Sequence, residues 1–187
     1  DVQTYTRLTL DSDGALLLAD SPPAWANQPL GTDGPAPRLA PFWDDLSVDA
    51  VQARVVGEAP HRALIVTYRA RLAQGSSARF QAHLREGGHI TFLYDSVAGE
   101  RSDGAGATVG IQGPTAGLGY LFNGYPQQNR LHTGLAVCFM PPDGLYLSPG
   151  IQQGAAQAGQ DAVFTLWAVN QTGTDGAFGL SVESPWP

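Results

Sequence analysis

Apolar and polar residues alternate with a period of two along most of the chain, which is the pattern of half-buried β-strands. The clearest runs are 64–72, 78–85 and 90–94, which follow one another closely. In the first run Leu64 falls on one face of the strand and Arg69 on the other. Periodicity typical of a helix extends no further than about two turns. The pattern therefore predicts a protein built from short strands.

Turn signals separate these runs and predict hairpins. The segment 11–14, with the sequence Asp-Ser-Asp-Gly, joins an alternating run at 4–10 to the apolar run that follows it. Farther along, the Glu-Gly-Gly sequence at 86–88 fits a three-residue hairpin loop with a glycine in the left-handed conformation. That loop places Leu84 opposite Ile90, which agrees with the hydrophobic register.

One stretch combines two large aromatic residues with a preceding proline and two following carboxylates. Phe42 and Trp43 are neighbours, so their side chains point to opposite faces of an extended chain. A strand with a large aromatic on each face runs between two packed layers, and we therefore expect both rings to be buried. Pro41 fixes its own φ. Asp44 and Asp45 end the apolar run, and we expect them to accept backbone hydrogen bonds at a turn.

The segment 40–45 resembles the central motif of the nidogen-type (NIDO-like) extracellular β domain, as found in bacterial surface and secreted proteins. The segment 80–92 resembles the central hairpin of that family, 107–112 its late strand and 134–137 its closing strand. The nidogen pattern has a small residue where Asp44 stands, so the bacterial branch is the better match. The resemblance implies a non-catalytic extracellular module, located outside the cell or at its surface.

The sequence predicts an all-β protein of two parts. Residues 1–142 are expected to form a NIDO-like antiparallel β-sandwich, and residues 143–187 a smaller C-terminal β module. This second part contains short apolar runs and resembles the opening of immunoglobulin-like modules in bacterial surface proteins. The chain has 23 glycines and 14 prolines, which supply the turns that such a fold requires.

Two residues outside the main alternation are both expected to be packed. The segment 20–38 is rich in Pro, Gly and Asn and predicts a long surface loop, which Trp25 is expected to pin to the body of the protein. Cys138 is the only cysteine, so the chain cannot form an internal disulfide. It lies within an apolar strand, and we interpret it as a packed thiol and not as a nucleophile.

Charge and hydropathy exclude two classes of partner. The formal net charge is −7, which argues against nucleic acid and against anionic membrane surfaces. No apolar run is long enough to cross a bilayer, so we expect no direct insertion into a membrane. The remaining partners are other protein chains and glycans.

The sequence contains no arrangement typical of catalysis or metal binding, and we expect no catalytic residue, no metal and no cofactor. Asp44 and Asp45 diverge in an extended chain, so they do not flank one scissile bond. Calcium ligation is the alternative to their role in a turn. His83 and His89 lie beside arginines, whose positive charge opposes a divalent metal.

Basic side chains gather on the predicted outer face of the three central strands. They are Arg69, Arg71, Arg79, His83, Arg85 and His89, and we call them the basic face. In the expected register Arg71 and Arg79 are near cross-strand partners, which is unfavourable unless an acidic group faces them. One interpretation is a docking face for an acidic partner or a neighbouring subunit. The other is an ordinary solvated face of an antiparallel sheet.

Three functions fit these observations. The first is a structural or adhesive module of a cell-surface assembly, whose partners are other protein chains and above all copies of itself. The second is an accessory domain of a larger secreted enzyme such as a protease. The third is a glycan-binding module that uses Trp25 or Trp186 as a stacking platform.

The C-terminal module predicts a further interaction. It shows about three strands, whereas an immunoglobulin-like sandwich needs about seven. Its apolar strand edge is expected at Phe164, Trp167 and Phe178. Strands from a neighbouring chain in a filament would complete the module, and a trimmed piece of a longer protein is the alternative. Asn170 begins a glycosylation sequon in an expected turn.

Overall fold

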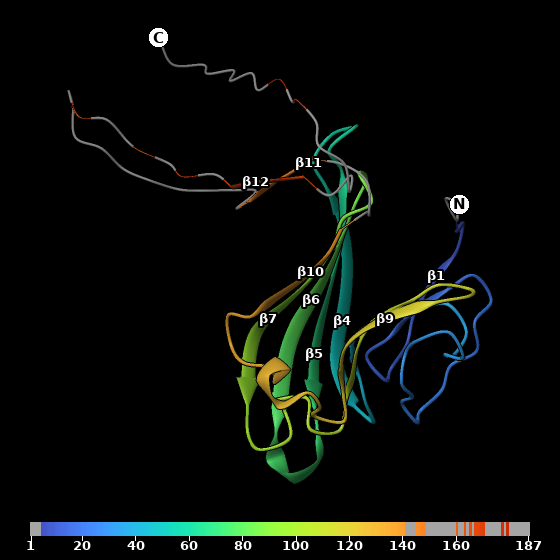
Figure 1. The fold of residues 1–187 in the computed structure, drawn as a ribbon. Coiled ribbons are helices and arrows are strands. Elements are labelled where there is room, and N and C mark those ends of the chain that lie inside the picture. The colour runs from blue at the N-terminus through green and yellow to red at the C-terminus, as the bar shows by residue number, and fades with distance from the viewer. Residues whose placement is uncertain are drawn as a thin grey trace. The chain divides into compact units, whose positions relative to one another are not determined.

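A computed structural model describes residues 5–140, 145–148, 160, 163, 165, 167–170, 177 and 179. Contacts divide the chain into two compact units, Asp1–Met140 and Pro141–Pro187. The strands of the first unit form two five-stranded antiparallel sheets. Figure 1 shows how the strands of this unit are arranged. The predicted all-β antiparallel fold is therefore confirmed. No helix of the described residues has the length and hydropathy to cross a membrane.

The two sheets of the first unit each combine strands that are distant in sequence. In order across the first sheet the strands are β1 (Leu8–Leu10), β2 (Leu16–Leu18), β3 (Arg38–Trp43), β8 (Thr108–Gln112) and β9 (Gly117–Phe122). In order across the second sheet they are β10 (Ala136–Phe139), β7 (Ile90–Ala98), β6 (Ser77–Arg85), β5 (Ala63–Arg71) and β4 (Ser47–Val56). Short 3-10 turns occur at Ala73–Gly75 and Gln127–Asn129.

Within the second unit, β11 (Leu145–Ser148) pairs antiparallel with β12 (Trp167–Asn170). Trp167 begins β12, and Asn170 ends it opposite Leu145. The predicted contacts of Phe164, Phe178 and Trp186 lie outside the described residues. The resemblance of this unit to an immunoglobulin-like module therefore stays a prediction.

The core between the sheets is dominated by stacked aromatic rings. Phe80 lies 5.5 Å from Phe42 and 5.0 Å from Tyr68 between ring centroids. Two buried tyrosines of the second sheet also bond to backbone carbonyls of the first sheet and its hairpin. The Tyr68 hydroxyl donates to the Ala15 carbonyl at 3.2 Å. The Tyr94 hydroxyl donates to the Pro41 carbonyl at 2.5 Å. These contacts fix the spacing of the two layers.

The β6–β7 hairpin has the predicted register. Leu84 faces Ile90, and Gly88 adopts the left-handed conformation with a φ of 84°. The Gly88 amide donates to the Arg85 carbonyl at 2.9 Å, which closes the three-residue loop. The preference of glycine for positive φ and the hydrophobic alternation therefore specify the same pairing.

The pairing of β5 with β6 brings arginines together across the strands. Arg79 faces Arg69 and Arg71 faces Ser77, so Arg71 and Arg79 are diagonal neighbours on one face, near each other as predicted but not directly opposite. The cause is a compact link, because the Leu72 amide donates to the Ser76 carbonyl at 2.8 Å around the 3-10 turn. This short closure sets the register of the strand pair, and the arginines stay on the face that the alternation predicts.

Candidate functional site

The aromatic motif lies on β3, between the core and a second apolar layer. Phe42 and Trp43 are both 0% exposed, which confirms the predicted burial on opposite faces. Phe42 joins the core between the sheets, whereas Trp43 packs with Ala40 and Leu17 in a smaller cluster on the other side of the first sheet. The pairing of β3 with β8 shifts between Ala40 and Trp43, where Pro41 lacks an amide hydrogen.

A long loop covers Trp43. The Trp43 indole donates from Nε1 to the Ala24 carbonyl at 2.7 Å. The Arg38 guanidinium lies 4.2 Å from the centroid of the Trp43 ring, and its Nε donates to the Ala36 carbonyl at 3.0 Å. Trp43 and Arg38 therefore anchor both ends of the loop by hydrogen bonds to its backbone.

Trp25 does not have the predicted anchoring role. Its side chain is 75% exposed, so the expectation that it pins the loop is wrong. Ala24 packs against the cluster beneath the loop, and the chain bends at Trp25. Burial of the smaller residue therefore directs Trp25 toward solvent.

The carboxylates after the motif belong to a turn network. The Asp44 side chain accepts a hydrogen bond from the Asp45 amide at 2.9 Å, and the Asp44 amide donates to the Asp13 carbonyl at 3.1 Å. Burial raises the pKa of Asp44, and burial together with the charges of neighbouring aspartates raises the pKa of Asp13. Gly14 has a φ of 76°, and a Cβ there would lie 2.1 Å from the Phe42 oxygen, so only glycine fits this contact.

The potential ligands and nucleophiles are dispersed over the molecule. Among the described residues, no group of three or more His, Cys, Asp or Glu side chains could hold a metal ion. His83 bonds through Nε2 to Gln81 at 2.7 Å, and burial followed by the nearby charges of Arg85 and Arg54 lowers its pKa. Cys138 is exposed, so the predicted packed thiol is wrong. It lies on the outer face of β10, an edge strand whose inner residues fill the core.

The basic face carries its own acidic partners. Arg71 forms an ion pair with Asp49 at 2.8 Å, and Arg79 forms one with Asp95 at 3.1 Å. These carboxylates come from the neighbouring strands β4 and β7. The positive charges of Arg71 and Arg79 are thus balanced within the chain. Arg69 and Arg85 have no ion pair in the part of the chain that the structure describes, and His83 and His89 complete the face.

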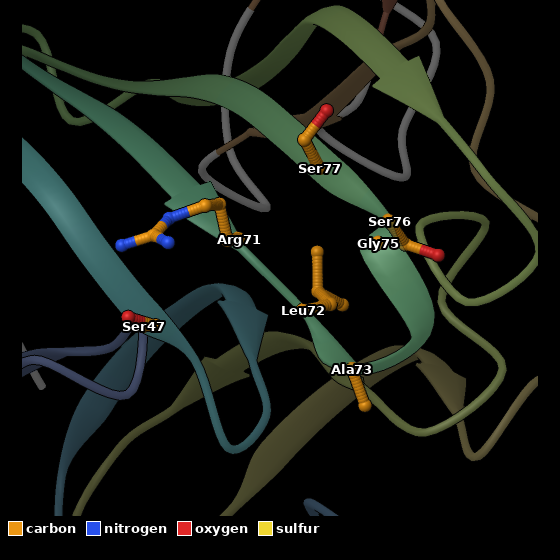
Figure 2. A pocket seen from close by; sticks show the side chains of 7 residues that line it. All are labelled: Ser47, Arg71, Leu72, Ala73, Gly75, Ser76 and Ser77. Atoms are coloured by element: carbon orange, nitrogen blue, oxygen red, sulfur yellow. The ribbon is translucent and has the colours of Figure 1, made fainter.

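Two open depressions adjoin this face. The first has a volume of about 560 Å³ and lies at the end of β5, where Arg71 reaches toward Ser47 of β4 (Figure 2). The second has a volume of about 490 Å³ and is lined by Gln52, Ala53, Arg54, Thr67, Arg79 and Gln81. Their linings carry no nucleophile paired with a general base. These depressions are therefore better suited to contact with the surface of another molecule than to catalysis.

Exposed aromatic residues mark a different part of the first unit. Tyr125 is 75% exposed, to the same extent as Trp25. The loop segment that carries Trp25 is bound close to it, because the Asn27 Nδ2 donates to Asn123 at 3.0 Å and to the Gly106 carbonyl at 2.7 Å. Tyr125 was not among the residues predicted from the sequence, although its position after an Asn-Gly pair is a turn signal.

The family assignment rests on a profile described as NIDO related, which matches residues 1–133. That match covers more than half of the chain, and the chain belongs to the NIDO-related family. No match was found among curated proteins or among solved structures. NIDO-related domains are non-catalytic modules that are typically extracellular. The predicted nidogen relationship is therefore confirmed.

Proposed function

We propose that the chain is a structural or adhesive module of an extracellular surface, which acts through contacts with other protein chains. The observation that carries this proposal is that the side chains of the family motif at 40–45 serve the fold. Phe42 and Trp43 are both fully buried, and Asp44 bonds to backbone in a turn. The two aromatic rings of the most distinctive stretch of the sequence thus stabilise the fold and are not presented to solvent.

Assembly into a filament is the finer part of this proposal. In the second unit, the described residues form a two-stranded sheet. Such a sheet is marginally stable by itself and gains stability from further strands. Strands of a neighbouring chain, contacting the unit near Trp167, supply them. A head-to-tail contact of this kind propagates without closing and therefore gives a polymer.

Sedimentation velocity and negative-stain electron microscopy of the purified chain test the assembly. We expect species larger than a dimer that grow with protein concentration, and we expect Trp167→Ala to reduce them. Trp25→Ala is the matched control, because it removes a tryptophan that is 75% exposed in the other unit. A chain that remains no larger than a dimer at every concentration overturns the filament.

The exposed tryptophan supports a second candidate, a glycan-binding accessory domain of a larger secreted enzyme. Trp25 and Tyr125 present flat apolar rings to solvent on two segments joined through Asn27 and Asn123. Aromatic faces with adjacent amides suit the stacking and hydrogen bonding of a sugar. Binding on a glycan array that is lost in Trp25→Ala, and retained in Leu118→Ala at another exposed site, supports this candidate. A chain that binds no glycan excludes it.

A further inference from the structure

The strand β4 forms an open edge of the second sheet. It is ten residues long and stands last in the strand order, after β5. From Ala50 to Val56 its register with β5 is continuous. Among the described residues, β4 pairs with no other strand. Over this segment one side of its backbone therefore has no strand partner in the part of the chain that the structure describes.

The other sheet edges are better protected. Of the outer strands, β1 has three residues, β10 has four, and β9 has six with a shift in its register. Short strands, bulges, prolines and charges are the devices that prevent strands from pairing with other chains. β4 has a bulge only near its start, between Val48 and Ala50, and its segment 50–56 contains the single charge of Arg54.

The open edge also exposes apolar side chains. All residues of 50–56 are exposed, and the exposed fractions of Val51, Val55 and Val56 are 40%, 65% and 37%. Val51 faces Tyr68 and Val55 faces Leu64, so both valines lie on the core-facing side of the sheet and are still exposed. A strand that is both unpaired and apolar is a favourable surface for strand addition.

We propose that β4 pairs antiparallel with β4 of a second copy, about a two-fold axis at Ala53. This register uses the whole open segment, because Ala50 lies opposite the partner's Val56. Val51 lies opposite the partner's Val55 on the core-facing side, and Gln52 lies opposite the partner's Arg54 on the outer side. The pairing thus places apolar side chains against apolar ones and leaves no charge opposite a like charge.

The neighbouring two-fold registers fit less well. An axis at Arg54 places this residue opposite its own copy, which is repulsive. An axis at Gln52 places Val55 opposite the partner's Asp49, which lies in the bulge and pairs with Arg71. The axis at Ala53 is the alternative that combines the valines and avoids both conflicts.

This inference deepens the proposed function and rests on it for the extracellular setting, but it concerns a different contact from the filament. A two-fold contact uses the same surface on both copies and therefore closes at the dimer. It joins the second sheets of two copies into one continuous sheet. The dimer and the polymer can therefore be observed separately.

The first experiment measures the dimer of the purified full chain by sedimentation velocity over a concentration series. We expect the double variant Val51→Lys, Val55→Lys to weaken the dimer by about tenfold or more, because lysine does not bury its charge between the copies. Both positions are exposed, so the variant keeps its fold. Leu118→Lys on β9 is the matched control, because Leu118 is 60% exposed at a different edge, and it should leave the dimer unchanged.

The second experiment tests the register by disulfide formation in a Cys138→Ser background. Residues directly opposite in an antiparallel pair have Cα atoms about 4.5–5.5 Å apart, within the range of a disulfide. Ala53→Cys should therefore cross-link two copies under mild oxidation. Ala50→Cys is the matched control, because in this register its copy lies about 20 Å away along the strand. It should remain uncross-linked.

The outcomes separate the two contacts. A chain that is monomeric throughout, a dimer unchanged by the double lysine variant, or cross-linking through Ala50→Cys as readily as through Ala53→Cys overturns the pairing of β4. A dimer that follows these expectations without polymers supports β4 and overturns the filament. Suppose instead that the double lysine variant still forms polymers and that its smallest sedimenting species is the same as that of the unmodified chain. This result supports the filament and overturns the pairing of β4.

Discussion

Replacement of Trp43 by alanine is expected to destabilise the first unit by about 3–5 kcal/mol, the usual range for a buried large aromatic. The ring is 0% exposed, and its Nε1 bonds to the Ala24 carbonyl at 2.7 Å. Its removal also leaves the Arg38 guanidinium without the aromatic face 4.2 Å away. A desolvated cation–π contact contributes about 2 kcal/mol. The loss of this contact places the variant toward the upper end of the range.

Trp43→Phe separates the hydrogen bond from the packing. Phenylalanine retains most of the apolar surface and an aromatic face for Arg38, but it cannot donate to the Ala24 carbonyl. Leaving a buried acceptor unsatisfied costs about 1–3 kcal/mol, and because Ala24 is only partly buried we expect this variant to lose about 1 kcal/mol, at the lower end of that range. Trp25→Ala is the control, since substitution of a residue that is 75% exposed should change stability by no more than about 0.5 kcal/mol.

Equilibrium urea unfolding, followed by far-ultraviolet circular dichroism, measures the three variants. The free energies are compared at similar m-values, so that the change reflects the folded state. The expected order of destabilisation is Trp43→Ala, then Trp43→Phe, then Trp25→Ala. A loss below about 1 kcal/mol for Trp43→Ala, or an equal loss for Trp25→Ala, would refute the anchoring of the loop through Trp43.

Three further expectations follow from other contacts. Tyr94→Phe removes a buried hydrogen bond of 2.5 Å to β3 and should cost about 1–3 kcal/mol in the same assay; an unchanged midpoint would contradict the tie between the sheets. Hydrogen bonds from Arg62 lower the pKa of Glu86 to about 2. Their stabilising effect is therefore complete above pH 4.5 and is lost as the pH falls toward 2. A Glu86 carboxyl chemical shift that titrates near pH 4.5 would contradict this lowered pKa. Charge reversal at Arg69 and Arg85 should weaken binding of polyglutamate to the basic face, more strongly at low salt, and binding that is insensitive to both changes would exclude an electrostatic docking face.

The local pattern of the sequence was sufficient for the β6–β7 hairpin. Its alternation and its Glu-Gly-Gly loop specify one register, and the structure has Leu84 opposite Ile90. Both signals act between residues close in sequence, so neither depends on the rest of the fold. The burial of Phe42 and Trp43 was likewise predictable, because adjacent aromatics on a strand require two apolar environments.

The features that depend on distant pairings were not predictable. Trp25 and Trp43 are the same residue type, and only the position of the loop over β3 determines which of them is buried. Cys138 is exposed because it lies on the outer face of β10, and the sequence of the strand does not reveal which of its faces is covered. The carboxylates that balance the basic face, Asp49 and Asp95, were missed because they come from neighbouring strands.

The bonds of Tyr68 and Tyr94 between the sheets end on backbone carbonyls, at Ala15 and Pro41. A carbonyl oxygen is present whichever amino acid occupies the position, so most substitutions at Ala15 leave an acceptor in place. The hydroxyl, in contrast, belongs to tyrosine alone. Random mutagenesis should therefore find replacement of either tyrosine by phenylalanine destabilising, while Ala15 is limited by the space available to its side chain. Amino-acid substitutions in one sheet can thus accumulate without a compensating substitution in the other sheet.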